Sequence, residues 1–235
     1  MIDTLCRLLD AGVTQFHVVK ECEDILLDHD YRKLDIGERW ELMAGGRYYV
    51  KPYPSMLVAF AIGEVPEYGR LNIGLAHTDF PMLKIKTQPD MNRCGYQTLN
   101  VEPYGGLIKE TWFDRPLGIA GKVVVQTEDP FRPRTYLYDS ERAMCIVPSL
   151  APHLRKETTG DKMNVQKELI PVYGLNGQNV KEKDILQYVA EDLGLLKDDI
   201  LDYDLYLYNM DHMEIVGAEK DICLLYTSPS PRDVE

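Results

Sequence analysis

The sequence of 235 residues has little of several features that mark particular protein classes. It contains no apolar run of about 18 residues, so no segment is predicted to span a membrane. Its 26 basic residues are outnumbered by 38 acidic ones, which gives a net charge of −12. This charge argues against a nucleic-acid backbone or an anionic membrane surface as partner. It is compatible with a cationic or zwitterionic small substrate.

Cysteine is also scarce, and no two cysteines form a CxxC pair. An odd, dispersed set predicts reduced thiols rather than a disulfide framework. Residues 1–5 lack the basic and apolar regions of a secretory signal, so we expect a cytoplasmic protein. The five cysteines are Cys6, Cys22, Cys94, Cys145 and Cys223.

Two stretches near the N-terminus have apolar residues at helical spacing and are predicted to form amphipathic helices. The first covers residues 2–10 and the second residues 14–26, with Thr14 as the N-cap. Two β-like runs follow, at residues 47–50 and 56–62, with turn residues between them. These runs are predicted to pair as antiparallel strands.

A short apolar run at residues 71–76 ends abruptly at His77-Thr78-Asp79. Such a run predicts a strand buried on both faces, and strand alternation would place His77 and Asp79 on the same side. Ligands collect at the carboxyl ends of strands in open α/β sheets, and a nearby carboxylate often orients a metal-binding histidine. A lone His-x-Asp also occurs by chance in many proteins, so the tripeptide alone leaves both interpretations open.

From about residue 88 the pattern changes, and short β-like runs alternate with turn residues. One convincing helix interrupts them, with Asp184 as N-cap and Gly194 at the C-cap position. The shift predicts a β-rich second domain inserted after the strand that carries His77. The β-like runs are residues 97–101, 119–126, 135–138, 145–147 and 204–208.

Six segments form a linked set of motifs: 16–19 (FHVV), 45–50 (GGRYYV), 76–86 (AHTDFPMLKIK), 101–106 (VEPYGG), 111–123 (TWFDRPLGIAGKV) and 147–154 (VPSLAPHL). Together they resemble the aspartyl aminopeptidase family of dizinc metallopeptidases, which also includes vacuolar aminopeptidase I. The similarity covers roughly residues 1–222 in the family's order, and the number of linked motifs makes it specific.

The resemblance implies an α/β fold in which a catalytic mixed-sheet domain is interrupted by a β-rich dimerisation domain. Residues 1–88 would begin the catalytic domain, residues 89–212 would form the inserted domain, and residues 213–222 would return as a strand. Residues 223–235 do not continue the family pattern, and we interpret them as a non-native tail; a natural Ser/Pro-rich disordered terminus is the alternative. The catalytic domain is therefore expected to be truncated.

The resemblance also implies a zinc-dependent aminopeptidase that removes N-terminal residues from peptides by metal-activated water, with acidic residues as the namesake preference. His77 matches the first ligand of a two-zinc site, and Asp79 matches the acidic residue that orients it. His153 matches a histidine that reaches the substrate site of a neighbouring subunit. Family members assemble through dimers into dodecamers. The later ligands and the general base are absent, so the isolated chain is expected to be inactive.

Two other functions stay open: a non-catalytic oligomerisation module, and another dizinc hydrolase such as a deacylase. Trp112, Asp114 and Arg115 could form a substrate clamp, because arginine pairs bidentately with carboxylates. A structural pair that fixes the domain junction is the favoured interpretation. Asp211-His212 suits a metal site by residue type alone and is interpreted as surface polar.

Overall fold

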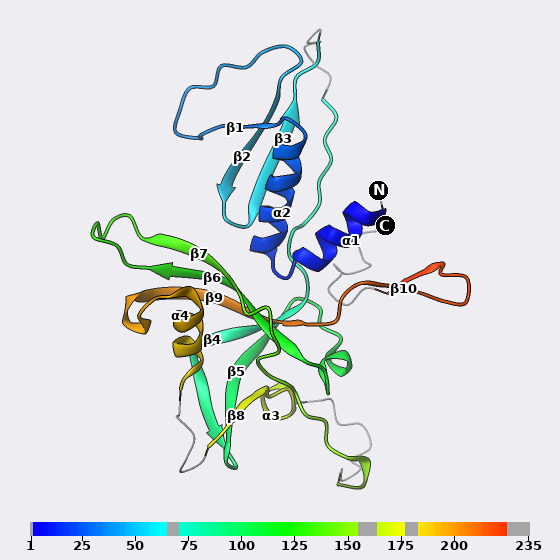
Figure 1. The fold of residues 1–235 in the computed structure, drawn as a ribbon, viewed down its shortest axis with the longest axis vertical. Coiled ribbons are helices and arrows are strands. Elements are labelled where there is room, and N and C mark those ends of the chain that lie inside the picture. Colours follow the sequence, from blue (N-terminus) through cyan, green and yellow to red (C-terminus); the bar gives the residue numbers. More distant parts are fainter. Residues whose placement is uncertain (1, 65–70, 155–163, 177–182, 225–235) are drawn as a thin grey trace. The chain divides into compact units, whose positions relative to one another are not determined.

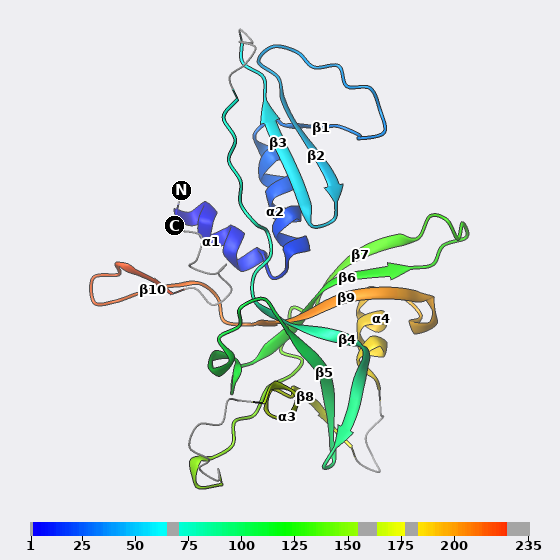
Figure 2. The same cartoon turned by 180° about the vertical axis from the view of Figure 1, so that it is seen from behind.

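The computed structural model describes residues 2–64, 71–154, 164–176 and 183–224. The chain divides into two compact units, Met1–Asp79 and Phe80–Glu235, and each is described by itself. The fold class is α/β, as predicted: a mixed sheet with helices comes first, and a larger antiparallel sheet follows. Figure 1 and Figure 2 show the two units from opposite sides.

The first unit contains two helices and a three-stranded sheet of order β1-β2-β3. β1 runs parallel to β2, and β2 is antiparallel to β3, so the sheet is mixed. Helix α2 lies alongside this sheet in both views (Figure 1, Figure 2). The two predicted helices and the predicted antiparallel strand pair are confirmed. The elements are α1 (Ile2–Ala11), α2 (Gln15–Asp28), β1 (Arg32–Lys33), β2 (Arg47–Tyr53) and β3 (Met56–Ala61).

The break between α1 and α2 follows from local chemistry. A Cβ at Gly12 would lie 2.7 Å from the carbonyl oxygen of Leu8, so a larger residue would collide with the end of α1. Thr14 is the N-cap of α2, as predicted, with extended backbone angles. Its hydroxyl lies 2.8 Å from Nδ1 of His17 and makes no cap hydrogen bond to the backbone. His17 is therefore tied to the start of its own helix.

The second unit is built on a six-stranded sheet of order β7-β6-β9-β4-β5-β8, in which every neighbouring pair is antiparallel. Short helices lie in its connections, and the four-residue α3 was not predicted. The strands are β4 (Met82–Arg93), β5 (Tyr96–Tyr104), β6 (Leu117–Val125), β7 (Arg134–Asp139), β8 (Val172–Leu175) and β9 (Ile200–Asn209). The helices are η1 (Lys109–Trp112), η2 (Pro152–Leu154), α3 (Val165–Glu168), α4 (Ile185–Leu193) and η3 (Lys197–Asp199).

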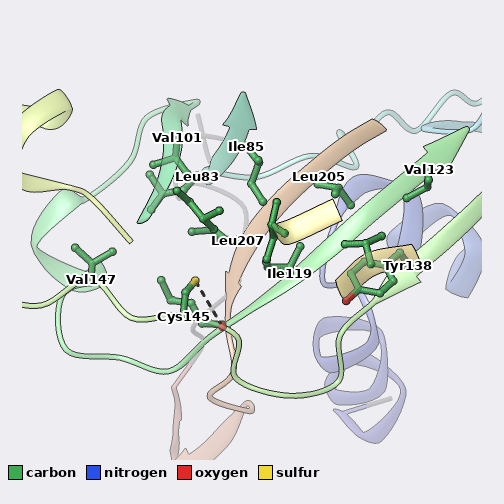
Figure 3. Packing of buried hydrophobic residues seen from close by; sticks show 14 of the residues in the cluster. Leu83, Ile85, Val101, Ile119, Val123, Tyr138, Cys145, Val147, Leu205 and Leu207 are labelled. Atoms are coloured by element: carbon green, nitrogen blue, oxygen red, sulfur yellow. Dashed lines mark hydrogen bonds between the residues drawn. The ribbon is translucent and has the colours of Figure 1, made fainter. Parts of the chain in front are cut away.

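The core of the second unit is a cluster of buried residues from this sheet, from α4 and from the connecting segments, and Figure 3 shows part of it from close by. Central strands contribute fully buried residues such as Leu83, Ile119 and Leu207. Ile185 and Val189 of α4 belong to the same cluster. Burying side chains of this size contributes about 1.5–3 kcal/mol each, so this cluster is the main source of the unit's stability.

Helix α4 begins and ends as the sequence predicts. The Asp184 side chain accepts a hydrogen bond from the backbone N–H of Gln187, and the Gln187 side chain accepts one from Asp184 N, which completes a capping box. At the other end Gly194 has φ 68°, a left-handed conformation that glycine adopts without steric cost.

The predicted buried strand at residues 71–76 is wrong. The segment has no regular secondary structure, and Leu71, Ile73 and Leu75 are 81%, 70% and 94% exposed. A buried strand needs neighbouring strands for its backbone and an apolar layer on each face. The described part of the chain places neither beside this segment.

The division between the units falls after Asp79, whereas composition placed the boundary after residue 88. The physical reason is that β4 is one continuous strand of the larger sheet and crosses residue 88. Residues 145–147 form isolated β-bridges rather than the predicted strand.

Residues 213–222, expected to return as a strand, lie in a hairpin, and their return into the catalytic domain stays a prediction. β10 (Glu214–Val216) pairs antiparallel with β11 (Ile222–Leu224) as a separate two-stranded sheet. The turn between them uses positive φ angles at Gly217 and Lys220, which bring the chain back on itself. Residues 225–235 of the proposed non-native tail lie outside the described residues.

Candidate functional site

His77 and Asp79, the predicted ligand and its orienting residue, lie close together in the first unit. Nδ1 of His77 is 2.6 Å from the backbone carbonyl oxygen of Asp79 and 3.5 Å from Oδ1 of the same residue. The side chains are 39% and 44% exposed. The nearer partner of the ring is thus the carbonyl oxygen and not the predicted carboxylate. Either acceptor would hold the ring proton on Nδ1 and leave Nε2 as the metal-binding atom.

Thr78, between these two residues, ties the segment to the β2–β3 turn. Its hydroxyl donates a hydrogen bond to the carbonyl oxygen of Ser55 at 2.9 Å. His77 is exposed, whereas Thr78 is partly buried. Although the segment is not a strand, this anchor fixes its backbone on one side while His77 and Asp79 contact each other.

A complete metal site is not formed by the residues that the structure describes. Across those ranges no group of three His, Cys, Asp or Glu side chains is placed to hold an ion. A catalytic zinc usually takes three protein ligands plus water. His77 with Asp79 therefore suits one ligand position and its support, and this part of the chain does not complete the coordination.

His153 lies in the second unit, within the short helix η2, and is exposed. It is preceded by a segment that Asp114 contacts: the Asp114 N–H donates to Val147 O at 2.9 Å, and Oδ1 of Asp114 accepts from Ser149 N at 2.9 Å. Asp114 itself has φ 58°. The segment that leads to His153 is thus held by a residue from the TWFDRP motif.

The substrate-clamp interpretation of Trp112, Asp114 and Arg115 is not supported by their contacts. Arg115 forms an ion pair with Asp211, which follows β9 after Met210. Trp112 packs against the core of the second unit. These contacts tie loops of the second unit together, which agrees with a structural role. Asp211 is thus a structural partner, although the sequence indicated only a surface polar residue.

The Asp114–Ser149 contact was missed by sequence reasoning. The two residues are 35 positions apart, and no local pattern links them. The one available signal was the residue type, since aspartate is among the few residues that tolerate a left-handed backbone and also accept hydrogen bonds. That signal identifies a turn and gives no information on its partner.

The thiols give no support for a cysteine nucleophile in the described residues. Cys6, Cys22, Cys94 and Cys145 are all unpaired, which confirms the prediction of free thiols for these four. Burial raises the pKa of the Cys145 thiol, so it stays protonated and unreactive. Figure 3 shows its sulfur directed toward the carbonyl oxygen of Leu117, 3.9 Å away.

None of the helices in the described ranges has the length and apolar character that crossing a lipid bilayer requires.

Comparison with protein families finds a match over residues 8–227 to the family described as aminopeptidase I zinc metalloprotease (M18). A curated relative from Clostridium acetobutylicum, named probable M18 family aminopeptidase 2, is 36% identical over 211 residues. That alignment covers 88% of this chain and 48% of the relative. The chain therefore spans about half the length of the curated relatives it matches.

Solved structures give the same result at the level of the fold. Chaetomium thermophilum mApe1 superposes with a TM-score of 0.82 and 26% identity, covering 94% of this chain and 53% of that one. The structure titled as the S. cerevisiae mApe1 dodecamer superposes with a TM-score of 0.69 and 22% identity, covering 92% and 49%.

Proposed function

Because the chain belongs to the M18 family of aminopeptidases, we propose that it forms part of an enzyme that removes N-terminal residues from peptides. The observation that carries the proposal is the contact between His77 and Asp79 inside a family match over residues 8–227. Acidic N-terminal residues are the substrate class we assign to it. The family match favours a peptidase over the deacylase alternative.

In this proposal His77 is one zinc ligand. Nδ1 lies 2.6 Å from the Asp79 carbonyl oxygen, which fixes the ring orientation and presents Nε2 to the metal. Oδ1 of Asp79, 3.5 Å from the same nitrogen, would help to hold this ring orientation. The remaining ligands, the second of two zinc ions and the general base would be supplied by residues outside the described part of this chain.

The exposed apolar segment before His77 supports the proposal that this chain carries only part of the catalytic domain. Leu71, Ile73 and Leu75 occupy alternate positions and are mostly exposed, which is the pattern of a strand without its neighbours. Exposed apolar residues in such a row usually mark a surface that another part of a protein covers. We propose that the covering part belongs to the region of the complete protein that this chain does not include.

The complete enzyme is proposed to be a homo-oligomer built from dimers, with the dodecamer named for the yeast relative as the full assembly. The exposure of His153 supports a role at the substrate site of a neighbouring subunit. Free Cys6, Cys22, Cys94 and Cys145 are consistent with the cytoplasmic location that the sequence predicts.

The proposal is tested on the complete protein that carries this chain, with zinc content and hydrolysis of peptides with acidic N-termini as readouts. We expect His77→Ala to remove bound zinc and activity together, and Asp79→Asn to lower both about 10–100-fold. His29→Ala, at an exposed position of the first unit, is the matched control and should change neither. Full zinc content and full activity in His77→Ala would disprove the assignment.

The non-catalytic alternative is favoured by one observation, the complete core of the second unit. If residues 80–224 serve only to assemble subunits, the complete protein should form oligomers without any zinc-dependent hydrolysis. Zinc titration of the 235-residue chain addresses the same point: we expect weak binding, and tight stoichiometric binding would contradict the view that His77 lacks its co-ligands here.

A further inference from the structure

We propose that Asp114 is a positioning residue for the segment that carries His153. The consequence of this role for catalysis rests on the proposed function. The structure gives Asp114 two contacts with that segment and a backbone conformation that most residues avoid. Within residues 111–116 (TWFDRP), the described structure shows one other backbone contact with residues 147–149, the β-bridge between Phe113 and Val147.

Residues 145–147, at the start of this segment, are also held by contacts with other residues. Cys145 forms a β-bridge with Leu117, with Leu117 N donating to Cys145 O at 2.9 Å. Val147 is then fully buried and forms a parallel bridge with Phe113. Up to this point the backbone is held by strand-like contacts and by the core.

Asp114 extends the anchoring by two residues. Its N–H donates to Val147 O, and its Oδ1 accepts from Ser149 N, both at 2.9 Å. Leu150 is half-exposed, and the segment then enters η2 through a hydrogen bond from Leu154 N to Ala151 O. Asp114 is therefore the long-range anchor nearest to His153 among the contacts that the structure describes.

The chemistry suits an aspartate at this position. With φ 58°, residue 114 lies in the left-handed region, which aspartate, asparagine and glycine adopt more readily than other residues. Hydrogen bonds from the Ser149 side chain and then from its backbone N–H lower the pKa of the Asp114 carboxyl. The acceptor therefore stays ionised at neutral pH, and charge-assisted hydrogen bonds are the stronger kind.

The test uses two substitutions that both tolerate the left-handed backbone. Asp114→Gly removes the acceptor, whereas Asp114→Asn keeps an oxygen in its place. Glu141→Gly is the matched control, because Glu141 has φ 50° in an exposed turn and makes no described contact with residues 147–154.

Hydrogen–deuterium exchange on the 235-residue chain tests the anchoring without any reference to activity. We expect Asp114→Gly to raise exchange at the Ser149 amide about tenfold or more, with a smaller rise in Asp114→Asn. Glu141→Gly should leave that amide unchanged. Equal exchange at Ser149 in Asp114→Gly and in the parent chain would overturn the proposal.

Kinetics of the complete enzyme test the link to His153 through a double-mutant cycle. Asp114→Gly should lower kcat/KM in the parent enzyme, Asp114→Asn should restore most of it, and neither should have an effect in a His153→Ala background. An equal loss in both backgrounds would show that Asp114 acts by another route. If the protein has no peptidase activity the proposed function fails, while the exchange result still decides the anchoring role.

Discussion

The hydroxyl of Tyr49, on β2, donates a hydrogen bond of 3.0 Å to the carboxylate of Glu23, on α2. The same carboxylate accepts from Lys33 at 2.6 Å and from Lys51 at 2.9 Å. Glu23 is buried and Tyr49 is only 1% exposed. One acidic group thus joins the helix to two strands of the first sheet, so it is the polar counterpart of the apolar core in this unit.

Replacing Glu23 should destabilise the first unit. Glu23→Ala leaves the buried Tyr49 hydroxyl without this acceptor and separates two lysines from their counter-charge, so we expect a loss of about 2 kcal/mol in unfolding free energy. Urea unfolding, followed by circular dichroism, measures the change. Glu21→Ala is the matched control on the same helix. The side chain of its ion-pair partner Arg7 is 56% exposed, so this variant should cost below about 1 kcal/mol. Equal costs for the two variants would contradict the structural role of Glu23.

The Glu23 carboxylate should make the stability of the first unit depend on pH. Burial opposes ionisation of Glu23, but hydrogen bonds from Lys33 and Lys51 outweigh it and lower the pKa to about 2. A folded-state pKa below the unfolded value of 4.5 means that the contribution is present above pH 4.5 and is lost as pH falls toward 2. The stability difference between the parent chain and Glu23→Gln should therefore shrink over this interval. A constant difference down to pH 2 would show that Glu23 does not titrate in this way.

The N-cap of α4 should account for measurable stability in the second unit. Asp184→Ala removes the capping box and the ion pair with Lys197, and we expect a loss of about 1 kcal/mol. Asp184→Asn keeps a capping oxygen and should lose less. Asp198→Ala, an exposed acidic position in η3, serves as the control. Urea midpoints of the four proteins give the comparison, and identical midpoints for Asp184→Ala and Asp198→Ala would refute it.

For a substitution in the exposed segment before His77, we expect different costs in the 235-residue chain and in the complete protein. Ile73→Ala should change the unfolding free energy of the 235-residue chain by less than about 0.5 kcal/mol, because Ile73 is 70% exposed. In the complete protein the same change should cost about 2 kcal/mol or more, because burial of the side chain is then lost. Leu83→Ala, at a fully buried position, should be costly in both. No difference between the two proteins for Ile73→Ala would mean that this segment stays uncovered.

Elements that local chemistry specifies could be predicted from the sequence. Helix α4 has its cap residues Asp184 and Gly194 within a few positions of its apolar face, so pattern and boundary agree. The strands β2 and β3 follow each other directly, and their pairing needs only a turn. In these cases the decisive interactions lie within a short length of chain.

Features that depend on distant partners could not be predicted. Residues 71–76 have the composition of a buried strand, yet burial requires neighbours that the segment itself does not specify. Glu23 is separated by 10 positions from Lys33 and by 28 from Lys51, so a helix pattern shows only a polar position. The candidate site divides in the same way, since His77 and Asp79 are neighbours in sequence, while the Asp114–Ser149 contact depends on the tertiary fold.

The continuity of β4 has a practical consequence for dividing the chain. An expression boundary at residue 88, where composition changes, would cut this strand between Ile85 and Asp90. A product that starts after residue 88 keeps Asp90 but loses Leu83 and Lys84, which pair with Leu207 and Tyr206 of β9, so the central strand would lose this partner. A boundary after Asp79 keeps the strand whole, and it leaves His77, Thr78 and the turn at Ser55 together on one polypeptide.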